Sequence, residues 1–516
     1  MKYPIGIQTF EEIIEGGYVY VDKTYLVYKL VDEGKYYFIS RPRRFGKSLL
    51  TTTLEAYFLG KKELFKGLAM EKLEQDWVEH PVFHIDFSGA DYTNPEMVCN
   101  RINTYLAEWE KKYGRNDVEV ATGDRLFGVI SRAKEQTGKQ VVILIDEYDK
   151  PLTDTIGKPE IQDKNRSTLQ EIYGIMKRAD RHIRFAFLTG VTRYGKLGIF
   201  SAANNPDDIS MVDDYASICG ITEKELRDHF DDEVQVFADK EKVSKEQMYQ
   251  KLKRKFDGYH FSINCDDVYN PFSLLGSLKS KMLENKWFAT GTPTYLISML
   301  KKKSYDLSQF GKGIIATAET MSSFGNGDEN MIASLYQSGY LTIKNYDGRK
   351  YYSLGFPNEE VEDGFIQCLI DEYSAPDNGN KDYYLQKLRD DIEADDAEGF
   401  MTQIQLIMGQ IPFEKDEPKL IEANFRNMVF LMIRFSGFKV EVEHQVSSGR
   451  IDILFETEKR VYVIECKRDK SAAEALEQIN MKKYAQKISS TDKPVVKIGA
   501  NFSTAERNLT EWEMEE

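Results

Sequence analysis

The chain of 516 residues is poor in cysteine, lacks long apolar runs and has no excess of basic residues. Its five cysteines are scattered and form no Cys-x-x-Cys pair, so neither a disulfide framework nor a zinc cluster is indicated. No apolar run is long enough to span a bilayer, and the polar, aromatic N-terminal segment lacks the features of a signal peptide. We therefore expect a reduced, cytoplasmic protein without a membrane segment.

The formal net charge of −15 argues against a nucleic-acid binder that is basic overall. It does not exclude a local basic groove, because binding follows the local electrostatic field and not the sum of the charges. The length allows several domains, and the hydrophobic fraction of 41% allows each of them a sizeable core.

The first informative stretch runs from Ile39 to Leu50 and reads Ile-Ser-Arg-Pro-Arg-Arg-Phe-Gly-Lys-Ser-Leu-Leu. The apolar run 36–39 predicts a strand before it, and the helical spacing of apolar residues in 49–58 predicts a helix after it. At such a turn backbone N–H groups point at bound phosphates, Lys47 can reach the β and γ phosphates, and Ser48 can ligate Mg²⁺. The residues predicted to bind nucleotide here are Arg43, Arg44, Phe45, Gly46, Lys47, Ser48 and Leu49.

This loop departs from the usual phosphate-loop pattern at one position. Arg41 stands five residues before Gly46, where a glycine is normal, and Pro42 follows it. The loop alone is also compatible with a basic turn before a surface helix. A second motif is needed to decide between the two interpretations.

Residues 141–150 supply that motif and read Val-Val-Ile-Leu-Ile-Asp-Glu-Tyr-Asp-Lys. The five aliphatic residues predict a central parallel strand that is buried on both faces. Asp146 and Glu147 follow at its carboxyl end, where open α/β sheets bind their ligands. Asp146 could hold Mg²⁺ and Glu147 could polarise an attacking water, whereas the alternative is a helix cap after a buried strand. Together with the loop, this motif favours an ATP-binding P-loop core.

A further predicted strand, residues 184–190, is followed by Thr192 and Arg193. Thr189, near its end, occupies the place where P-loop ATPases have a polar residue beside the γ-phosphate. Arg193 could help to stabilise charge there. The alternatives remain open: Thr189 could simply end the strand, and Arg193 could be solvated.

From about residue 223 the pattern changes to amphipathic helices with charged faces. Residues 330–356 predict a helix followed by a hairpin around Asp347-Gly348, which fits a small winged-helix-like unit. The aromatic turns 256–261 and 269–272 are interpreted as packing points without chemistry. Residues 374–384 are the best candidate for a linker.

A separate signal lies in residues 420–490. An apolar helix that ends at Gly437 is followed by three predicted strands, residues 439–443, 451–456 and 461–465. The flanks of the last strand are apolar, which indicates that it lies inside a sheet. The helix that follows it carries alanine, leucine and isoleucine on one face.

Three residues of these strands suggest chemistry. Asp452 opens the middle strand, and Glu465 and Lys467 lie two residues apart on the next, so that their side chains share a face. Two carboxylates can bind Mg²⁺, and the metal together with Lys467 can stabilise charge and orient a water in phosphodiester hydrolysis. The alternative is a cross-strand ion pair on a solvated face. Further polar residues on the neighbouring helices, for which surface roles fit equally well, are Glu422, Gln478 and Tyr484.

Both groups of motifs resemble those of one widespread bacterial family. Residues 41–48, 146–147 and 189–193 resemble its AAA-ATPase-like domain, in which Arg-Pro-Arg-Arg-Phe-Gly-Lys-Ser is the usual form of the loop. Asp452, Glu465-Cys466-Lys467 and Gln478 are similar to its C-terminal PD-(D/E)XK nuclease domain. Tyr484 follows Gln478 by six residues, wider than in RecB-type nucleases. The resemblance covers about residues 4 to 490.

We therefore predict an α/β protein in three parts. A P-loop NTPase (AAA-like) core with a parallel sheet occupies residues 1–222, a helical and winged-helix-like region 223–385, and a restriction-endonuclease-like PD-(D/E)XK domain 386–516. The hypothesis is that ATP binding or hydrolysis gates Mg²⁺-dependent cleavage of nucleic acid, with DNA as the first candidate, in defence or control of mobile elements. A homo-oligomer fits an AAA-like core. The rival hypotheses are an ATP-switched binder of nucleic acid that does not cleave it, and a protein in which both sites are vestigial.

Overall fold

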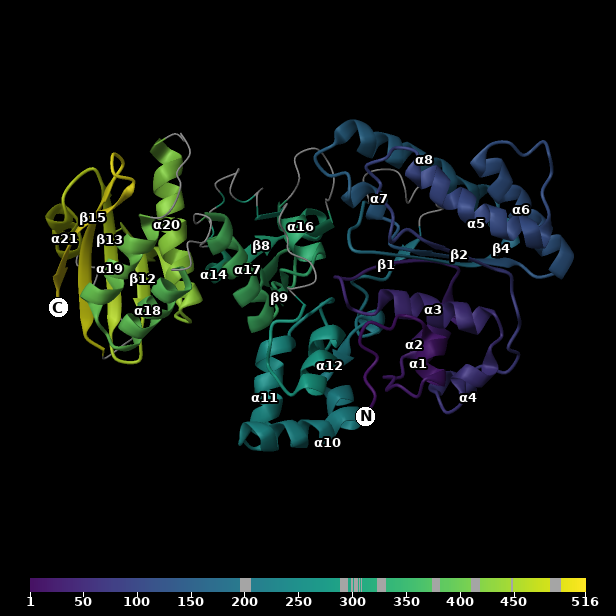
Figure 1. Cartoon of the computed structure of the whole chain (residues 1–516), viewed down its shortest axis with the longest axis horizontal. Coiled ribbons are helices and arrows are strands. Elements are labelled where there is room, and N and C mark those ends of the chain that lie inside the picture. The colour runs from purple at the N-terminus through teal and green to yellow at the C-terminus, as the bar shows by residue number, and fades with distance from the viewer. Residues whose placement is uncertain are drawn as a thin grey trace. The chain divides into compact units, whose positions relative to one another are not determined.

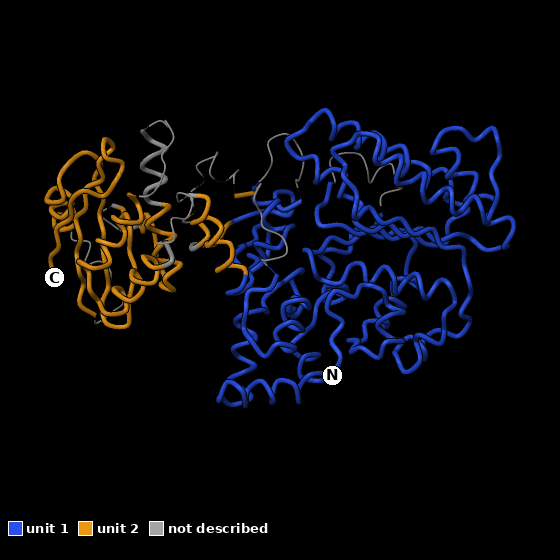
Figure 2. The backbone as a smooth tube through the Cα atoms, viewed as in Figure 1, with its two compact units in different colours: residues 1–291, 315–360 blue, residues 292–314, 361–516 orange. Residues whose placement is uncertain are grey.

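The structure is a computed structural model that describes residues 1–194, 206–287, 296–297, 300, 305, 307, 309–322, 331–373, 381–409, 418–446, 449–482 and 493–516. The chain forms two compact units, residues 1–291 with 315–360 and residues 292–314 with 361–516 (Figure 2). In the described parts of the chain, no helix is both long and apolar enough to cross a bilayer. The three domain ranges given above stay a prediction.

The first unit is built on a parallel five-stranded sheet in the order β2-β3-β4-β1-β5 (Figure 1). Every residue of β3 is buried, as expected for a central strand covered on both faces. Because β4 lies between β1 and β3, the carboxyl ends of these three strands meet at one edge of the sheet. This arrangement confirms the predicted P-loop-like core. The strands are β1 (Tyr36–Ser40), β2 (Val82–Asp86), β3 (Val141–Asp146), β4 (Ile183–Gly190) and β5 (Asp207–Asp208).

Helices cover both faces of this sheet (Figure 1). On one face, apolar residues at helical spacing, such as Leu106, Val129 and Ile172, pack against Phe83 and Ile143 of the strands. Burial of these side chains is the main source of stability of the layered core. The helices of this part are α1 (Phe10–Glu15), α2 (Thr24–Glu33), α3 (Lys47–Phe58), α4 (Ala69–Leu73), α5 (Met97–Tyr113), α6 (Thr122–Thr137), α7 (Lys150–Thr153) and α8 (Pro159–Arg178), with short 3-10 turns at Lys62–Phe65, Asp180–His182 and Asp213–Tyr215.

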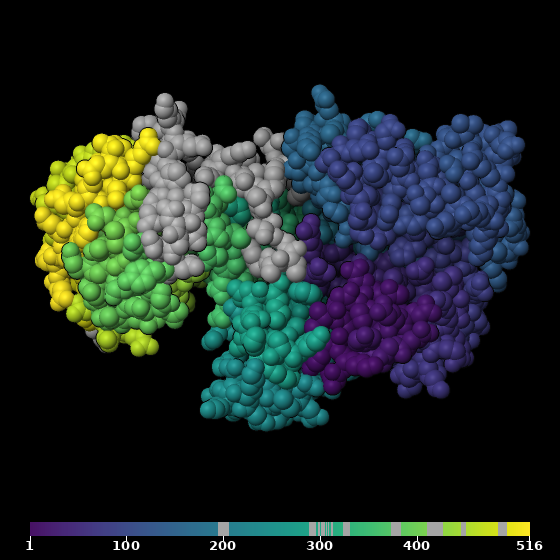
Figure 3. All heavy atoms as spheres, in the orientation of Figure 1, coloured from purple at the N-terminus to yellow at the C-terminus, as the bar shows by residue number. Residues whose placement is uncertain are grey.

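A cluster of three helices follows in the same unit. Thr222 caps the first of them: its hydroxyl accepts a hydrogen bond from the Glu225 N–H, and the Glu225 carboxylate accepts one from the Thr222 N–H. The cluster packs against N-terminal residues such as Tyr3 and Val19, and Figure 3 shows these two segments side by side at the surface. The elements are β6 (Ile221–Thr222), α10 (Glu223–Glu241), α11 (Lys245–Phe256), β7 (Val268–Tyr269) and α12 (Pro271–Ser280).

The predicted helix and hairpin of the middle region are present. The hairpin loop begins at Asp347, whose carboxylate accepts hydrogen bonds from the N–H groups of Arg349, Lys350 and Tyr351 at 2.8 to 3.0 Å. The hairpin pairs with a third strand in the order β8-β10-β9, the arrangement expected of a winged-helix-like unit. The elements are α14 (Gln309–Lys312), β8 (Ile314–Ala316), α15 (Ala318–Ser322), α16 (Met331–Gln337), β9 (Thr342–Tyr346) and β10 (Tyr352–Gly355).

We expect the stability of the first unit to depend on pH because of Asp257, the residue that follows α11. Its side chain is buried, and burial raises the pKa of its carboxyl from 3.8 to about 7. Between pH 3.8 and about pH 7 the folded protein keeps a proton on Asp257 that the unfolded chain has released. The free energy of unfolding therefore falls as the pH rises through this range. We expect Asp257→Asn to gain about 1–3 kcal/mol of stability over the wild type at pH 8 and almost none at pH 4.

Urea unfolding at both pH values measures this difference. The exposed Asp266, replaced in the same way, serves as the control. An equal difference between Asp257→Asn and wild type at pH 4 and pH 8 would contradict the assignment.

The second unit contains a mixed five-stranded sheet in the order β11-β12-β13-β14-β15, in which β13 and β14 are parallel and the other pairs antiparallel. The three predicted strands correspond to β11, β12 and β13, and two more complete the sheet. This confirms the predicted C-terminal α/β fold. The elements are α17 (Glu359–Tyr373), α18 (Lys381–Glu393), α19 (Ala397–Met408), α20 (Pro418–Phe435), β11 (Val440–Val446), β12 (Gly449–Glu456), β13 (Val461–Arg468), α21 (Ala472–Met481), β14 (Val495–Ser503) and β15 (Asn508–Glu515).

Candidate functional site

The loop between β1 and α3 lies where the sequence places it. Gly46 is the residue before the helix and has a φ of +91°, a left-handed conformation that favours glycine. As a glycine, Gly46 has no side chain with which to cap this end of α3. The first N–H groups of a helix have no partner within it, so the loop presents backbone donors of the kind that bind phosphate.

Lys47, the first residue of α3, is buried behind this loop. Its ammonium donates hydrogen bonds to the carbonyl oxygens of Arg41 and Pro42, at 2.9 and 3.1 Å. Burial lowers the pKa of Lys47, and the nearby carboxylates of Asp146 and Glu147 oppose that shift. The ammonium is thus held between the loop and the acidic end of β3. Ser48, the next residue, is half-buried.

Asp146, at the end of β3, is buried and accepts a hydrogen bond from the hydroxyl of Thr189, at the end of β4. The two strands are direct neighbours, with Ile145 paired with Leu188. The structure therefore brings together the acidic and the polar residue that the sequence analysis selected. The Asp146 carboxylate also interacts electrostatically with Lys47 of the loop.

Glu147 and Asp149 extend this acidic group. Glu147 has a φ of +52°, and burial raises its pKa. The buried carboxylate of Asp149 accepts hydrogen bonds from the N–H and the hydroxyl of Thr192, at 2.7 and 2.6 Å. Asp149 thereby fixes the segment after β4 against the segment after β3. This role was not predicted, although Asp149 lies within the motif of residues 141–150.

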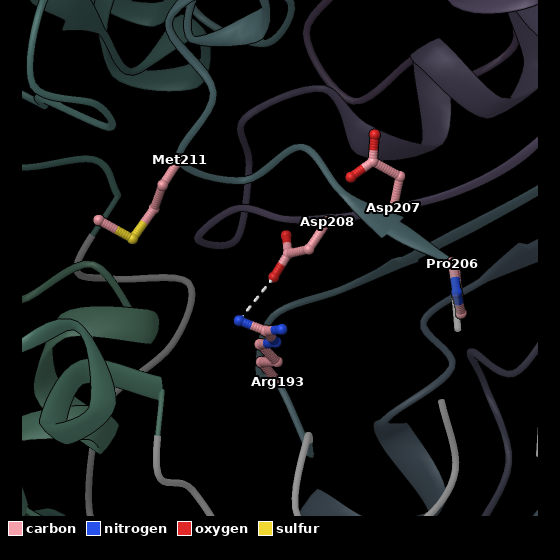
Figure 4. Close-up of a pocket in the computed structure, with 5 residues that line it drawn as sticks. All are labelled: Arg193, Pro206, Asp207, Asp208 and Met211. Carbon is pink, nitrogen blue, oxygen red and sulfur yellow. Dashed lines mark ion pairs between the residues drawn. The ribbon is translucent and has the colours of Figure 1, made fainter. Parts of the chain in front are cut away.

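Arg193 and Arg41, two arginines of the sequence motifs, contact residues 208–210 and not the acidic residues after β3. The Arg193 guanidinium forms an ion pair of 2.9 Å with Asp208 and lines a cavity of about 500 Å³ (Figure 4). Arg41, in the position of the usual glycine, is buried; its guanidinium donates to the carbonyl of Ser210 at 2.8 Å and lies over the ring of Phe261. Arg41 thus fixes the start of the loop to the segment that contains Ser210. The predicted role of Arg193 at the phosphate stays a prediction.

The remaining loop residues differ in their surroundings. The side chains of Arg43 and Arg44 are exposed, and that of Leu49 is half-buried. Phe45 is buried and packs edge-on against Tyr259, with ring centroids 4.7 Å apart. The two arginine side chains are therefore accessible to a ligand, whereas Phe45 holds the loop in place.

The second candidate site lies where two strands separate. Strands β12 and β13 pair as far as Ile453 and Ile464, and the next two residues are Asp452 and Glu465. Strand β13 continues its pairing with β14 beyond this point. Asp452 instead accepts a hydrogen bond of 2.8 Å from the N–H of Cys466. The separation of the strands places both carboxylates at one opening in the sheet.

Glu465 is buried and has two partners from the predicted set. The Lys467 ammonium lies 3.3 Å from its carboxylate, and the amide of Gln478 on α21 donates to the same oxygen. Lys467 also donates to the Gln478 side-chain oxygen. Burial and the nearby Asp452 raise the pKa of Glu465 to about 7, while Lys467 lowers it. The four predicted residues therefore form one connected cluster.

The cluster fits a hard divalent cation. The second carboxylate oxygen of Glu465 is buried and has no hydrogen-bond partner in the described part of the chain. Within the same residues there is no group of three or more His, Cys, Asp or Glu side chains that could hold a metal. Mg²⁺ is commonly held by one or two carboxylates and completes its shell with water, so the pair Asp452 and Glu465 is compatible with it.

The other two residues considered for this site are not placed. Glu422 belongs to α20, but its side chain is outside the described residues, as is the whole of Tyr484. Sequence reasoning missed Gly499, which pairs with Glu465 across β13 and β14. A Cβ at Gly499 would overlap the backbone of Ala472 and Leu476 in α21, so a glycine is needed for α21 to bring Gln478 close to Glu465.

Comparisons with known proteins match the two regions of the chain that hold the candidate sites. A family model described as "Predicted AAA-ATPase" matches residues 4–200, and another, described as "PD-(D/E)XK nuclease superfamily", matches residues 420–512. A curated relative from Azotobacter chroococcum mcd 1, named "Uncharacterized protein in vnfD 5'region", is 33% identical over 524 residues, which cover 100% of this chain and 99% of the relative. The chain therefore belongs to the family of AAA-ATPase-like proteins with a C-terminal PD-(D/E)XK nuclease domain.

Proposed function

We propose that the protein binds and hydrolyses ATP at the loop of the first unit and cleaves nucleic acid, with DNA as the first substrate to test, at the cluster of the second unit. The observation that carries the proposal is the buried carboxylate of Glu465, which has one oxygen held by Lys467 and Gln478 and the other without a hydrogen-bond partner in the described residues. Such an oxygen beside Asp452 supports metal-assisted phosphodiester hydrolysis.

The residues of the second unit would divide the work as follows. Asp452 and Glu465 would hold Mg²⁺, which would supply Lewis-acid chemistry when bound. Lys467 places its positive charge beside Glu465, where it can donate to a phosphate oxygen on which charge develops. Gln478 contacts both of these side chains and fixes their distance.

In the first unit, the loop N–H groups and Lys47 would bind the phosphates of ATP. Ser48 and Asp146 would hold its Mg²⁺, and Thr189 orients Asp146 through their hydrogen bond. Glu147, beside Asp146, would position the attacking water. By analogy with the family, the proposal extends to a homo-oligomer that acts in defence or in the control of mobile elements.

The proposal is tested with the purified full chain on circular and linear DNA, with Mg²⁺ or Mn²⁺ and with or without ATP. Cleavage that needs the metal, and that ATP alters, supports both halves of the proposal. Cleavage that ATP leaves unchanged supports the nuclease alone. If the protein binds DNA in an ATP-dependent way and cleaves it under no condition, the hypothesis of an ATP-switched binder replaces the proposed nuclease.

Gly499→Ala tests how α21 is positioned. The new methyl group forces α21 away from β14, because the two nearest atoms that it meets belong to the backbone of the helix. Gln478 then moves away from Glu465, and we expect cleavage to fall by about tenfold or more, since small misplacements of catalytic groups are costly. Gly174→Ala, where a Cβ meets no atom within 4 Å, is the control. Wild-type cleavage by Gly499→Ala would contradict the role given to α21.

A further inference from the structure

Trp287 connects the phosphate loop to the first turn of α17. Its indole N–H donates a hydrogen bond of 3.0 Å to the carbonyl oxygen of Arg43, in the middle of the loop. The ring is 5% exposed and packs against Tyr340, with ring centroids 5.3 Å apart. Such a hydrogen bond favours one orientation of the peptide group that it contacts, because breaking the bond costs free energy.

The backbone of the same residue is held from the opposite side. The N–H groups of Lys286 and Trp287 both donate to one carboxylate oxygen of Glu360, at 2.5 and 2.8 Å. Glu360 is 1% exposed and is the second residue of α17. From Val361 onward α17 belongs to the second compact unit. One buried residue thus contacts the loop through its side chain and the start of this helix through its backbone.

The remaining surroundings of the loop restrict how it can move. Phe45 is packed between Tyr259 and Phe261 of an aromatic turn to which the sequence analysis gave no chemistry. Gly339, with a φ of +88°, lies so close to Pro42 that a Cβ there would be 2.6 Å from its ring. A loop confined on these sides transfers a change of its backbone to the contact that it makes with Trp287.

We propose that Trp287 is a positioning residue that couples the conformation of the phosphate loop to α17 through Glu360. Phosphate bound at the loop N–H groups orients the peptide units of the loop, and the Arg43 carbonyl transmits that orientation to the indole. The first consequence is tighter nucleotide binding when the indole N–H is present. The second, which rests on the proposed function, is that α17 carries the signal to the part of the chain that holds the nuclease cluster.

Trp287→Phe tests the first consequence. It keeps an aromatic ring and removes the donor, and we expect the affinity for a fluorescent ATP analogue to fall by about tenfold, the loss typical of one hydrogen bond. Trp77→Phe is the matched control, because the buried Trp77 indole N–H has no partner in the described residues. Unchanged affinity in Trp287→Phe would overturn the proposal.

A spectroscopic measurement keeps the test independent of the stability of that variant. In a protein whose other tryptophans, Trp77, Trp109 and Trp512, are replaced by Phe, the fluorescence of Trp287 reports on its own hydrogen bond. We expect ATP to change its emission in proportion to the bound fraction. Emission that ATP leaves unchanged while the analogue binds would overturn the proposal.

Glu360→Gln tests the second consequence. The variant removes the charge that holds the Trp287 backbone, and we expect ATP affinity within twofold of the wild type but a loss of most of the effect of ATP on DNA cleavage. An unchanged effect of ATP on cleavage would overturn the coupling to α17. Absence of cleavage in the wild type would instead refute the proposed nuclease, and the binding and fluorescence experiments would still decide the role of Trp287.

Discussion

Lys467→Ala is expected to lower metal-dependent DNA cleavage by about a hundredfold or more, the loss typical of removing a group that stabilises transition-state charge. The ammonium lies 3.3 Å from the Glu465 carboxylate and also donates to Gln478. Its removal takes away a positive charge at the opening between β12 and β13 and leaves the Gln478 oxygen without that donor. We expect both effects to act on a bound phosphate, which the ammonium can reach because the Lys467 side chain is 21% exposed.

The matched control is Lys470→Ala, which removes an equal charge three residues away. Lys470 is more exposed and pairs with Glu474 at 3.3 Å, on the surface, where such pairs contribute little. Rates measured for both variants over a range of Mn²⁺ concentrations separate loss of charge stabilisation from loss of metal affinity. Cleavage by Lys467→Ala at the rate of Lys470→Ala would show that the reaction occurs at another site or in a contaminant.

Much of the fold could be predicted because it follows from local patterns. The aliphatic run 141–145 indicates a central parallel strand by itself, and all of its residues are buried. The contact between Asp146 and Thr189 also follows, since carboxyl ends of neighbouring parallel strands meet. Strands β14 and β15 were not predicted. The place of β14 in the sheet depends on its parallel pairing with β13 beyond α21, which a local pattern does not encode, and β15 in turn pairs with β14.

The candidate sites also combine features that follow from local sequence patterns with features that depend on tertiary packing. Asp452, Glu465 and Lys467 could be recognised from their spacing on two strands, whereas the place where those strands separate could not. The buried guanidinium of Arg41 and the hydrogen bond from Trp287 to the loop join residues more than 150 positions apart. Such contacts are set by tertiary packing, so their residues look like ordinary loop and aromatic positions in the sequence.

Lys47→Ala is expected to weaken ATP binding by about a hundredfold and to abolish ATP hydrolysis, because charge-assisted contacts to phosphate are the strong ones at such a site. The buried ammonium also offsets the charge of three carboxylates, those of Asp146, Glu147 and Asp149. Without it, these acids would repel the phosphates of ATP. Lys47→Arg is not a substitute, since the planar guanidinium is larger and does not fit where two carbonyl oxygens hold a compact ammonium.

Binding of a fluorescent ATP analogue and release of phosphate measure these effects, with Lys61→Ala, a partly exposed lysine paired with Glu11, as the control. The informative comparison is DNA cleavage without ATP. If ATP gates the nuclease, Lys47→Ala keeps the rate that the wild type shows without nucleotide and no longer responds to ATP. A Lys47→Ala protein that still responds to ATP would contradict the assignment of the loop as the nucleotide site. Lys47 and Lys467 belong to different compact units. Lys47→Ala is therefore expected to remove the response to ATP, and Lys467→Ala to remove the cleavage reaction itself.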